Sequence, residues 1–209
     1  MNLSWHRLAA RRADQIANWL SPHLPLAGHV LDVGSGTGHN AVALRTRTQL
    51  ELAEADVVDM HAVGDGPALF DGIRLPFGDG EFAASLLIFV LQYPDNPLEL
   101  LLETRRVTTG RVLVVQSTYR GAVGLVLLKT REFLMGRFAF RLARMTRFIG
   151  DVPCPLTPRR YWTREEIIEL GRLANLTLRE VVPESPPNQV NCKRFLSRDL
   201  FVFESSPVP

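Results

Sequence analysis

The feature that most constrains the fold is a short apolar run that leads directly into closely spaced glycines. The segment is VLDVGSGTG, residues 30–38. An apolar run that ends in glycines predicts a strand followed by a tight turn, because glycine lets the backbone turn sharply and approach a ligand closely. In a doubly wound sheet, ligands bind at such turns, at the carboxyl ends of the strands. The structural alternative is an ordinary turn from a strand to a helix.

The rest of the first half predicts strands that alternate with helices. We expect helices at 4–20, 40–47 and 95–107, and strands at 29–33, 50–58, 68–70, 82–91 and 111–116, with Gly110 ending the connection before the last of these. This alternation predicts βαβ units and a parallel sheet. The continuous apolar run at 82–91 suits a strand that is buried on both faces.

The second half has a less regular pattern. A long helical stretch is expected at 121–149, followed by a proline-rich segment at 150–160. Thr163 and Glu166 have the spacing of a capping box and predict the start of another helix. Closing strands are expected at 176–182 and 200–204.

Bulk properties indicate one soluble domain. A chain of 209 residues with 46% hydrophobic residues can bury one continuous core. The formal net charge of +2 is too small to indicate a polyanionic partner. Cys154 and Cys192 form neither a metal-binding pair nor a disulfide framework. The segment 86–91 is the longest apolar run and is too short to cross a bilayer, and no signal-peptide core is present. We therefore expect a cytoplasmic protein.

Two further features indicate the type of cofactor. Asp56 stands at the expected end of the second strand, where an acidic side chain can accept hydrogen bonds from the ribose hydroxyls of an adenosine. The glycines follow a G-x-G-x-G pattern, and His39 occupies the position of the third glycine in the dinucleotide fingerprint G-x-G-x-x-G. This pattern favours an adenosine cofactor without a pyrophosphate over a nicotinamide dinucleotide.

The segment 30–38 resembles motif I of the class I S-adenosylmethionine-dependent methyltransferases. Further matches follow in register at 70–72, 75–82, 89–97 and 105–107, and 161–163 is similar to some relatives. The resemblance covers 28–116 and is to the small methyltransferase-domain type, which includes the quinone-biosynthesis enzymes. It implies a Rossmann-like three-layer α/β sandwich with a mostly parallel seven-stranded sheet, order 3-2-1-4-5-7-6, an antiparallel edge hairpin, and S-adenosylmethionine as cofactor.

The resemblance also implies roles for individual residues. Asp32 would orient the loop and reach the methionine ammonium through water, Asp56 would hold the ribose, and Asp71 would accept from the adenine amine. Each of these aspartates has an alternative role as a helix cap or turn residue. The implied cofactor-binding residues are Asp32, Gly34, Ser35, Gly36, Gly38, Asp56, Val57, Asp71, Gly72, Ile88, Phe89 and Tyr93.

The sequence departs from the family pattern at three places. Ala83 and Phe89 replace acidic residues, and Gln92-Tyr93 replaces a pair of histidines. Cofactor binding tolerates these changes, but no histidine base remains there. Methyl transfer from a sulfonium depends mainly on proximity and orientation, and it needs a base only when the acceptor must lose a proton. We therefore assign no catalytic residue and no metal ligand. Candidate acceptor contacts are His39, Gln92, Tyr119, Asp151 and Tyr161.

The segment 129–149 combines six cationic side chains with many aromatic and aliphatic ones. It has three interpretations: a core-facing helix with a solvated cationic face, a lid over an apolar acceptor pocket, or a peripheral surface that contacts anionic lipid. A nucleic-acid partner is disfavoured, because no RNA-binding module is recognisable.

Together these features predict a single methyltransferase domain over 1–209. It would comprise an N-terminal helix and linker (1–27), a cofactor-binding core (28–116), a helical lid or insertion (117–162) and a C-terminal helix with closing strands (163–209). The predicted function is methyl transfer from S-adenosylmethionine to a small, apolar molecule. The alternative is a catalytically silent module that binds the same cofactor for assembly or sensing.

Overall fold

A seven-stranded sheet forms the centre of the computed structural model, which describes residues 3–134, 158–184 and 195–205. The strand order is β3-β2-β1-β4-β5-β7-β6, as the family resemblance implies. The strands are β1 (His29–Val33), β2 (Glu51–Asp56), β3 (Ala68–Leu69), β4 (Phe82–Ile88), β5 (Thr108–Tyr119), β6 (Leu176–Pro183) and β7 (Leu196–Ser205). Strand β7 is antiparallel to β5 and β6, and β1 to β5 pair in parallel. The Rossmann-like fold class is confirmed.

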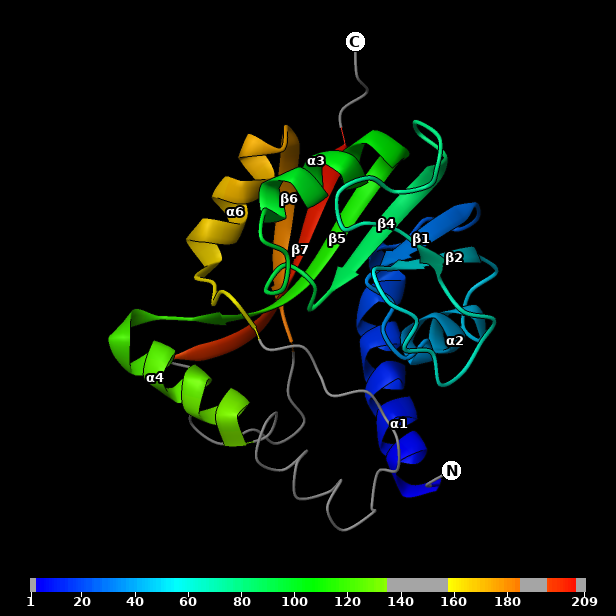
Figure 1. The fold of residues 1–209 in the computed structure, drawn as a ribbon. Helices are drawn as coiled ribbons and strands as arrows, with labels where there is room; N and C mark the ends of the chain where they lie inside the picture. Colours follow the sequence, from blue (N-terminus) through cyan, green and yellow to red (C-terminus); the bar gives the residue numbers. More distant parts are fainter. Residues whose placement is uncertain (1–2, 135–157, 185–194, 206–209) are drawn as a thin grey trace.

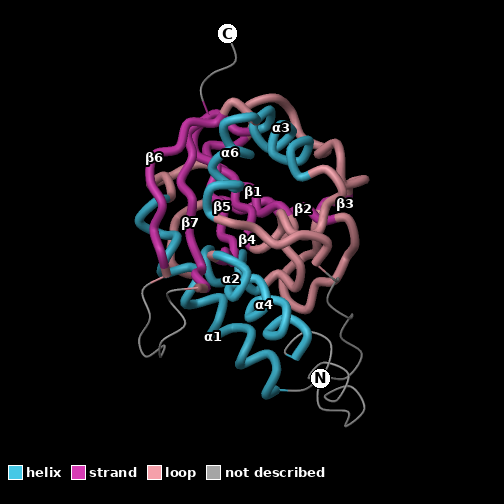
Figure 2. The backbone as a smooth tube through the Cα atoms, turned by 90° about the vertical axis from the view of Figure 1, so that its left-hand side faces the viewer, coloured by secondary structure: helices cyan, strands magenta, loops and turns pink. Residues whose placement is uncertain are grey.

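Helices cover both faces of this sheet. They are α1 (Leu3–Leu20), the 3-10 helix η1 (Ser21–His23), α2 (His39–Arg45), α3 (Pro97–Val107), α4 (Gly121–Glu132) and α6 (Arg164–Leu173). Helices α3 and α6 pack in the apolar cluster on one face, and α1 and α2 pack in the cluster on the other. In Figure 2, α3 lies above the strands and α1 and α2 lie below them. Among the helices of the described residues, none is both long and apolar enough to cross a membrane.

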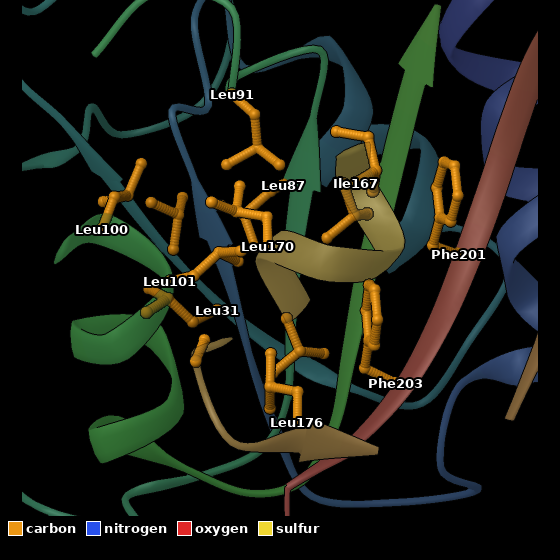
Figure 3. Packing of buried hydrophobic residues seen from close by; sticks show 14 of the residues in the cluster. Leu31, Leu87, Leu91, Leu100, Leu101, Ile167, Leu170, Leu176, Phe201 and Phe203 are labelled. Carbon is orange, nitrogen blue, oxygen red and sulfur yellow. The ribbon is translucent and has the colours of Figure 1, made fainter. Parts of the chain in front are cut away.

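Two apolar clusters fill the space between the layers. Successive side chains of a strand point to opposite faces, so Leu31 and Leu87 join the cluster under α3 and α6, whereas Val30 and Leu86 join the one under α1 and α2. Figure 3 shows the first cluster, where Leu101 and Leu170 meet above the sheet. The buried runs that were predicted as parallel strands therefore contribute side chains to both apolar clusters.

Several predicted strand boundaries were wrong: β2 ends at Asp56 and not at 58, β5 runs on to Tyr119, and β7 begins at Leu196. Two further differences have a clear structural reason. Strand β4 ends at Ile88 because Phe89 adopts a left-handed backbone conformation, with φ 59°. Gly110 does not end a connection but lies inside β5, which begins directly after α3. A Cβ at Gly110 would lie 2.2 Å from the carbonyl oxygen of Ala83, so this glycine allows β4 and β5 to approach at an irregular pairing.

The predicted capping box at the start of α6 is present. The Thr163 side chain accepts from the Glu166 amide, and the Glu166 side chain accepts from the Thr163 amide. The long helical stretch predicted at 121–149 corresponds to α4 as far as Glu132. Most of that stretch, together with Asp151, Cys154 and Cys192, lies outside the described residues.

A fully buried carboxylate ties the closing strands to α6. Asp199 accepts hydrogen bonds from Thr118 Oγ1 at 2.5 Å and from Ser197 Oγ at 2.7 Å, and it pairs with Arg164 at 2.7 Å. We expect Asp199→Ala to lower the free energy of unfolding by about 3 kcal/mol, because it leaves the partly buried Arg164 without its counter-charge and the buried Thr118 hydroxyl without its acceptor.

The matched control is Asp14→Ala, which removes the half-exposed partner of Arg47, 2.9 Å away. An exposed pair contributes at most about 1 kcal/mol. Urea denaturation measures both losses, and equal losses would contradict the role of Asp199.

Candidate functional site

The predicted glycine-rich turn lies at the carboxyl end of β1. Gly34, Gly36 and Gly38 all have positive φ, at 73°, 59° and 78°. Residues with a side chain rarely adopt this backbone conformation, which explains why all three positions are glycine. The amides of Gly34 and Ser35 donate to the carbonyl oxygen of Ala55 at 2.7 and 3.2 Å, so the loop is fixed against β2.

Asp56, the last residue of β2, fixes the same loop through hydrogen bonds. One carboxylate oxygen accepts from the Gly36 amide at 2.8 Å, and the other accepts from the Val57 amide at 2.7 Å. Each carboxylate oxygen can accept more than one hydrogen bond, so acceptor capacity remains for a ligand. Although only 6% exposed, Asp56 lines a cavity.

This cavity, of about 910 Å³, lies at the carboxyl ends of β1, β2 and β4. Its volume is at the upper end of the range for ligand clefts, with space for a cofactor and a second molecule. The structure brings most of the predicted site residues into its wall. They are Gly34, Ser35, Gly36, His39, Asp56, Val57, Asp71, Gly72, Ile88, Phe89 and Tyr93.

Three predicted acceptor contacts do not line this cavity. Gln92 accepts from the Gln116 side chain at 3.0 Å, and its carbonyl oxygen accepts from the Arg159 amide at 2.9 Å. Tyr119 donates its amide to Trp162 at 3.0 Å, and the Tyr161 ring lies 5.9 Å from the Lys129 ammonium. In the described part of the chain these residues connect segments around the cavity, and their contact with an acceptor stays a prediction.

Asp32 also lies outside the cavity wall, buried in the sheet at the end of β1. It is fully buried, and neither of its carboxyl oxygens has a hydrogen-bond partner among the described residues. Burial and, to a smaller extent, the nearby Glu54 and Asp56 together raise its pKa to about 8, although Arg45 opposes the shift. The carboxyl group therefore holds a proton at neutral pH in the unliganded protein.

This raised pKa gives stability a specific pH dependence. The folded protein keeps the Asp32 proton between the ordinary pKa of 3.8 and the raised pKa of about 8, whereas the unfolded chain has released it. The folded state binds more protons, so the contribution of Asp32 is fully present below about pH 4 and is lost as the pH rises to about 8. We expect Asp32→Asn to become progressively more stable relative to the wild type across that window. Thermal unfolding of both proteins from pH 5 to 8 measures this difference, and parallel curves would contradict it.

A second buried carboxylate supports the back of the loop. Glu54 lies 2.9 Å from the Arg45 guanidinium and 2.6 Å from His61 Nε2. A Cβ at Gly38 would lie 2.2 Å from the carbonyl oxygen of Val63 and 2.6 Å from His61 Cδ2. Gly38 is therefore required by close packing against 61–63, and it does not line the cavity.

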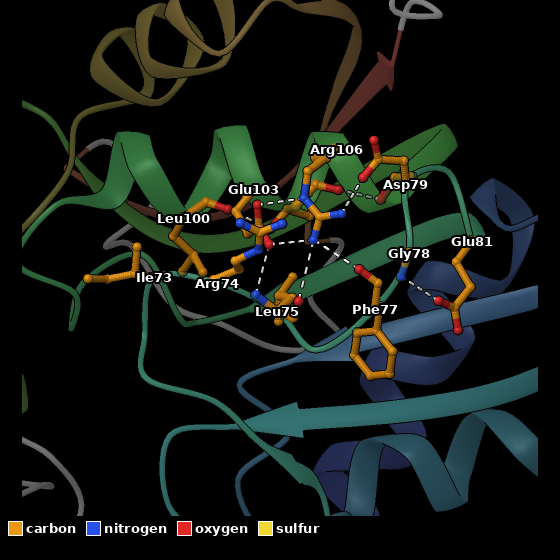
Figure 4. Close-up of polar contacts among 12 residues, drawn as sticks. Ile73, Arg74, Leu75, Phe77, Gly78, Asp79, Glu81, Leu100, Glu103 and Arg106 are labelled. Atoms are coloured by element: carbon orange, nitrogen blue, oxygen red, sulfur yellow. Dashed lines mark hydrogen bonds and ion pairs between the residues drawn. The ribbon is translucent and has the colours of Figure 1, made fainter.

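Asp71 combines the two roles considered for it. One of its oxygens accepts from the amides of Ile73 and Arg74, both at 2.8 Å, and these bonds lower its pKa. It therefore forms a turn, and it also lines the cavity. Helix α3 fixes the chain that follows this turn, because Glu103 accepts from the Leu75 amide at 2.8 Å and binds Arg106 (Figure 4).

His39 enters the cavity wall from the first turn of α2. Its Nδ1 lies 3.0 Å from Thr37 Oγ1 and its Nε2 lies 3.4 Å from His6 Nδ1. Burial lowers its pKa, His6 lowers it further, and Thr37 opposes the shift. The ring is therefore neutral at physiological pH, with both nitrogens engaged by the protein.

One wall of the cavity comes from a helix whose role the sequence did not reveal. The N-terminal part of α1 contributes Trp5, Leu8, Ala9, Arg12, Ala13 and Ile16. The sequence predicted this amphipathic helix but not its place over the site. The overlooked signal is Arg12, a cation within the apolar stripe, whose guanidinium carbon lies 5.0 Å from the centre of the Phe89 ring.

Sequence comparison connects these features to known proteins. Residues 31–114 match the family described as "Methyltransferase domain". An uncharacterized methyltransferase of Mycobacterium leprae is 35% identical over 126 residues, which cover 54% of this chain and 46% of that protein. An uncharacterized protein of Methanocaldococcus jannaschii is 23% identical over 151 residues, covering 72% and 65% of the two chains. The chain thus spans about half the length of the M. leprae relative.

Solved structures share the fold. The geranyl diphosphate C-methyltransferase of Streptomyces coelicolor, in complex with Mg²⁺, geranyl diphosphate and S-adenosyl-L-homocysteine, has a TM-score of 0.61 at 14% identity, covering 91% of this chain and 77% of that one. The [4+2]-cyclase SpnF has a TM-score of 0.66 at 15% identity, covering 94% and 82%. The matched domain, the strand order and the glycine-rich loop together make the chain similar to the class I S-adenosylmethionine-dependent methyltransferases.

Proposed function

We propose that the protein transfers the methyl group of S-adenosylmethionine to a small, largely apolar molecule bound in the same cavity. The observation that carries this proposal is the geometry of Gly36. A Cβ built on Gly36 meets nothing within 4 Å, and the Gly36 amide is held by the cavity-lining carboxylate of Asp56. The backbone therefore leaves open space beside a fixed anionic group, as binding of an adenosyl cofactor requires.

The residues of the cavity fit S-adenosylmethionine in chemical type. Asp56 would accept from the ribose hydroxyls, Asp71 and Gly72 would receive the adenine, and Gly34 with Ser35 would lie along the methionine portion. The donor, when bound, supplies an activated methyl group on a sulfonium. The positive charge of this group is compatible with the carboxylates of this wall.

The rest of the cavity wall is largely apolar, and this is the evidence for an apolar acceptor. Trp5, Leu8 and Ile16 of α1 face the cavity together with Phe89 and the adjacent Val90. These side chains would exclude water and orient the acceptor, which is the main requirement of an in-line displacement. His39 is neutral with both ring nitrogens engaged, so we assign it a positioning role and no proton transfer.

The predicted division into an N-terminal helix (1–27), a core (28–116), an insertion (117–162) and a C-terminal part (163–209) is retained in this proposal. The described part of the basic segment starts at the end of α4, where Val126 and Phe133 are exposed. Exposed apolar side chains next to Lys129 and Arg131 support a lid or a contact with anionic lipid for this segment. The specific similarity to quinone-biosynthesis enzymes stays a prediction.

The test is turnover of the methyl donor. The protein is incubated with S-adenosylmethionine labelled on its methyl carbon and with separate lipid, polar-metabolite, protein and RNA fractions of a cell extract. We expect S-adenosylhomocysteine to form with the lipid fraction and the label to enter a small molecule detected by mass spectrometry. Donor binding without turnover in any fraction would support a silent module, and label in protein or RNA would contradict a small acceptor.

A further inference from the structure

A buried polar cluster lies next to the glycine-rich loop but outside the cavity wall. Leu52, Glu54 and Asp56 occupy every second position of β2, so their side chains point to the same face of the sheet. Helix α2 lies next to β1 and β2 in Figure 1 and packs on this face. Asp56 reaches the cavity, whereas the Glu54 side chain is 3% exposed and does not line it. A carboxylate buried in this way needs polar partners inside the protein.

Glu54 has two such partners, which come from different segments. Arg45, the last residue of α2, lies 2.9 Å from one carboxylate oxygen. His61, in the loop between β2 and β3, has its Nε2 2.6 Å from the other oxygen. An ionised carboxylate can only accept, so the imidazole donates this hydrogen bond. The second ring nitrogen, Nδ1, has no hydrogen-bond partner among the described residues, and Asp59 Oδ1 lies 3.6 Å from it. The orientation of the ring therefore depends on Glu54.

His61 also packs against the glycine-rich loop. Its side chain is 6% exposed, and a Cβ at Gly38 would lie 2.6 Å from its Cδ2. The amide of Ala62 donates to the carbonyl oxygen of Thr37 at 3.1 Å. The segment that carries His61 is therefore joined to the loop at Thr37 and Gly38, directly before α2 begins.

The same segment contributes to the cavity wall. It is bound to the glycine-rich loop at both ends, because Asp56 accepts from the Gly36 amide and Ala62 donates to Thr37. Met60 lies between these two hydrogen bonds and lines the cavity. The position of Met60 thus depends on its neighbour His61, which fixes the segment to Glu54.

We propose that His61 is a positioning residue for the methyl donor. By donating to Glu54, it holds the glycine-rich loop and Met60 in the arrangement that receives the nucleoside. This inference rests on the proposed function, because it assumes that the donor occupies the cavity beside this loop. His61 does not line the cavity itself, so it acts on the donor through Gly38 and Met60 and not by contact.

Calorimetric titration of the full chain with S-adenosylhomocysteine tests this inference. His61→Leu removes the hydrogen bond to Glu54 and should weaken binding about tenfold, the loss of one hydrogen bond to a charged group. His61→Gln keeps an N–H donor and should bind within about threefold of the wild type. The matched control is His29→Leu, which removes an exposed histidine–glutamate pair, His29–Glu51 at 3.0 Å, and should bind normally.

A second measurement uses the wild-type protein and needs no substitution. A short hydrogen bond to a carboxylate moves an imidazole proton downfield in the NMR spectrum, and burial protects that proton from exchange with water. In protein that contains isotope-labelled histidine, we expect this resonance for His61, assigned through its contact with the Gly38 protons. It should shift when S-adenosylhomocysteine binds, because the ring packs against the loop that receives the nucleoside.

The outcomes separate the two proposals. Absence of nucleoside binding to the wild type would overturn the proposed function itself. Normal binding to the wild type would overturn only the role of His61 if the resonance stayed unchanged at saturating nucleoside. Wild-type affinity in His61→Leu, or losses in His61→Gln or His29→Leu as large as in His61→Leu, would overturn that role as well. Circular dichroism of each variant verifies that the affinities refer to folded protein.

Discussion

Gly36→Ala is expected to weaken S-adenosylmethionine binding by about 10- to 100-fold while the protein stays folded. The added methyl group meets no protein atom within 4 Å, so it projects into open space at the cavity wall. A methyl group forced into a filled site costs about 1–3 kcal/mol, which corresponds to that loss of affinity. Isothermal titration calorimetry measures the change directly.

The chain provides a closely matched control for this substitution. Gly121, at the start of α4, has φ 63° against 59° for Gly36, and its Cβ would also meet nothing within 4 Å. Both alanine variants should therefore lose the same free energy of unfolding, about 1–2 kcal/mol, because alanine disfavours a left-handed backbone. Only Gly36 lines the cavity, so Gly121→Ala should bind the donor normally. Similar affinities in the two variants would contradict the assignment of the glycine-rich loop.

Asp56→Ala should also weaken donor binding, by on the order of 100-fold, because two effects combine. The substitution removes the proposed acceptor for the ribose hydroxyls, and it leaves the amides of Gly36 and Val57 without their present partner. Hydrogen bonds to a charged group contribute about 1.5–3 kcal/mol each. Asp56→Asn separates the effects, since it keeps the shape of the side chain and one acceptor oxygen, and should lose less affinity.

Asp79→Ala is the control for this second prediction. Asp79 also binds a partner, Arg106, but its side chain is 83% exposed and lies outside the cavity wall. Calorimetry and circular dichroism on all three variants report affinity and folding separately. Unchanged affinity in Asp56→Ala, with a folded protein, would contradict the ribose assignment.

The sequence predicted the fold well because its signals are local. Glycines at 34, 36 and 38, the apolar run that begins at Phe82 and the cap at Thr163 each determine their structure through nearby residues, and the structure has a turn, a strand and a helix start there as expected. Only the end of that strand differs, at Ile88 in place of the predicted Leu91. The misplaced boundary at Gly110 had a non-local cause. That glycine is required by the carbonyl oxygen of Ala83 on the neighbouring strand, and the sequence order does not reveal this contact.

The same distinction applies to the site. The residues that follow the strand ends could be placed in a common cavity because parallel strands bring their carboxyl ends together. The wall that α1 forms could not be predicted from the sequence, since the position of an amphipathic helix depends on which side of the sheet it covers. Gln92 shows the converse, because it lies beside the site in sequence but binds Gln116 on β5 and does not line the cavity, so its contact with an acceptor stays a prediction.

The central claim is that the cavity at the carboxyl ends of β1 and β2 binds S-adenosylmethionine. A crystal structure of the protein with S-adenosylhomocysteine tests it most directly. We expect density for the nucleoside with its ribose hydroxyls at Asp56 and its amino-acid portion along Gly34 to Gly36. A nucleoside bound elsewhere, or an empty cavity at saturating ligand, would contradict the claim.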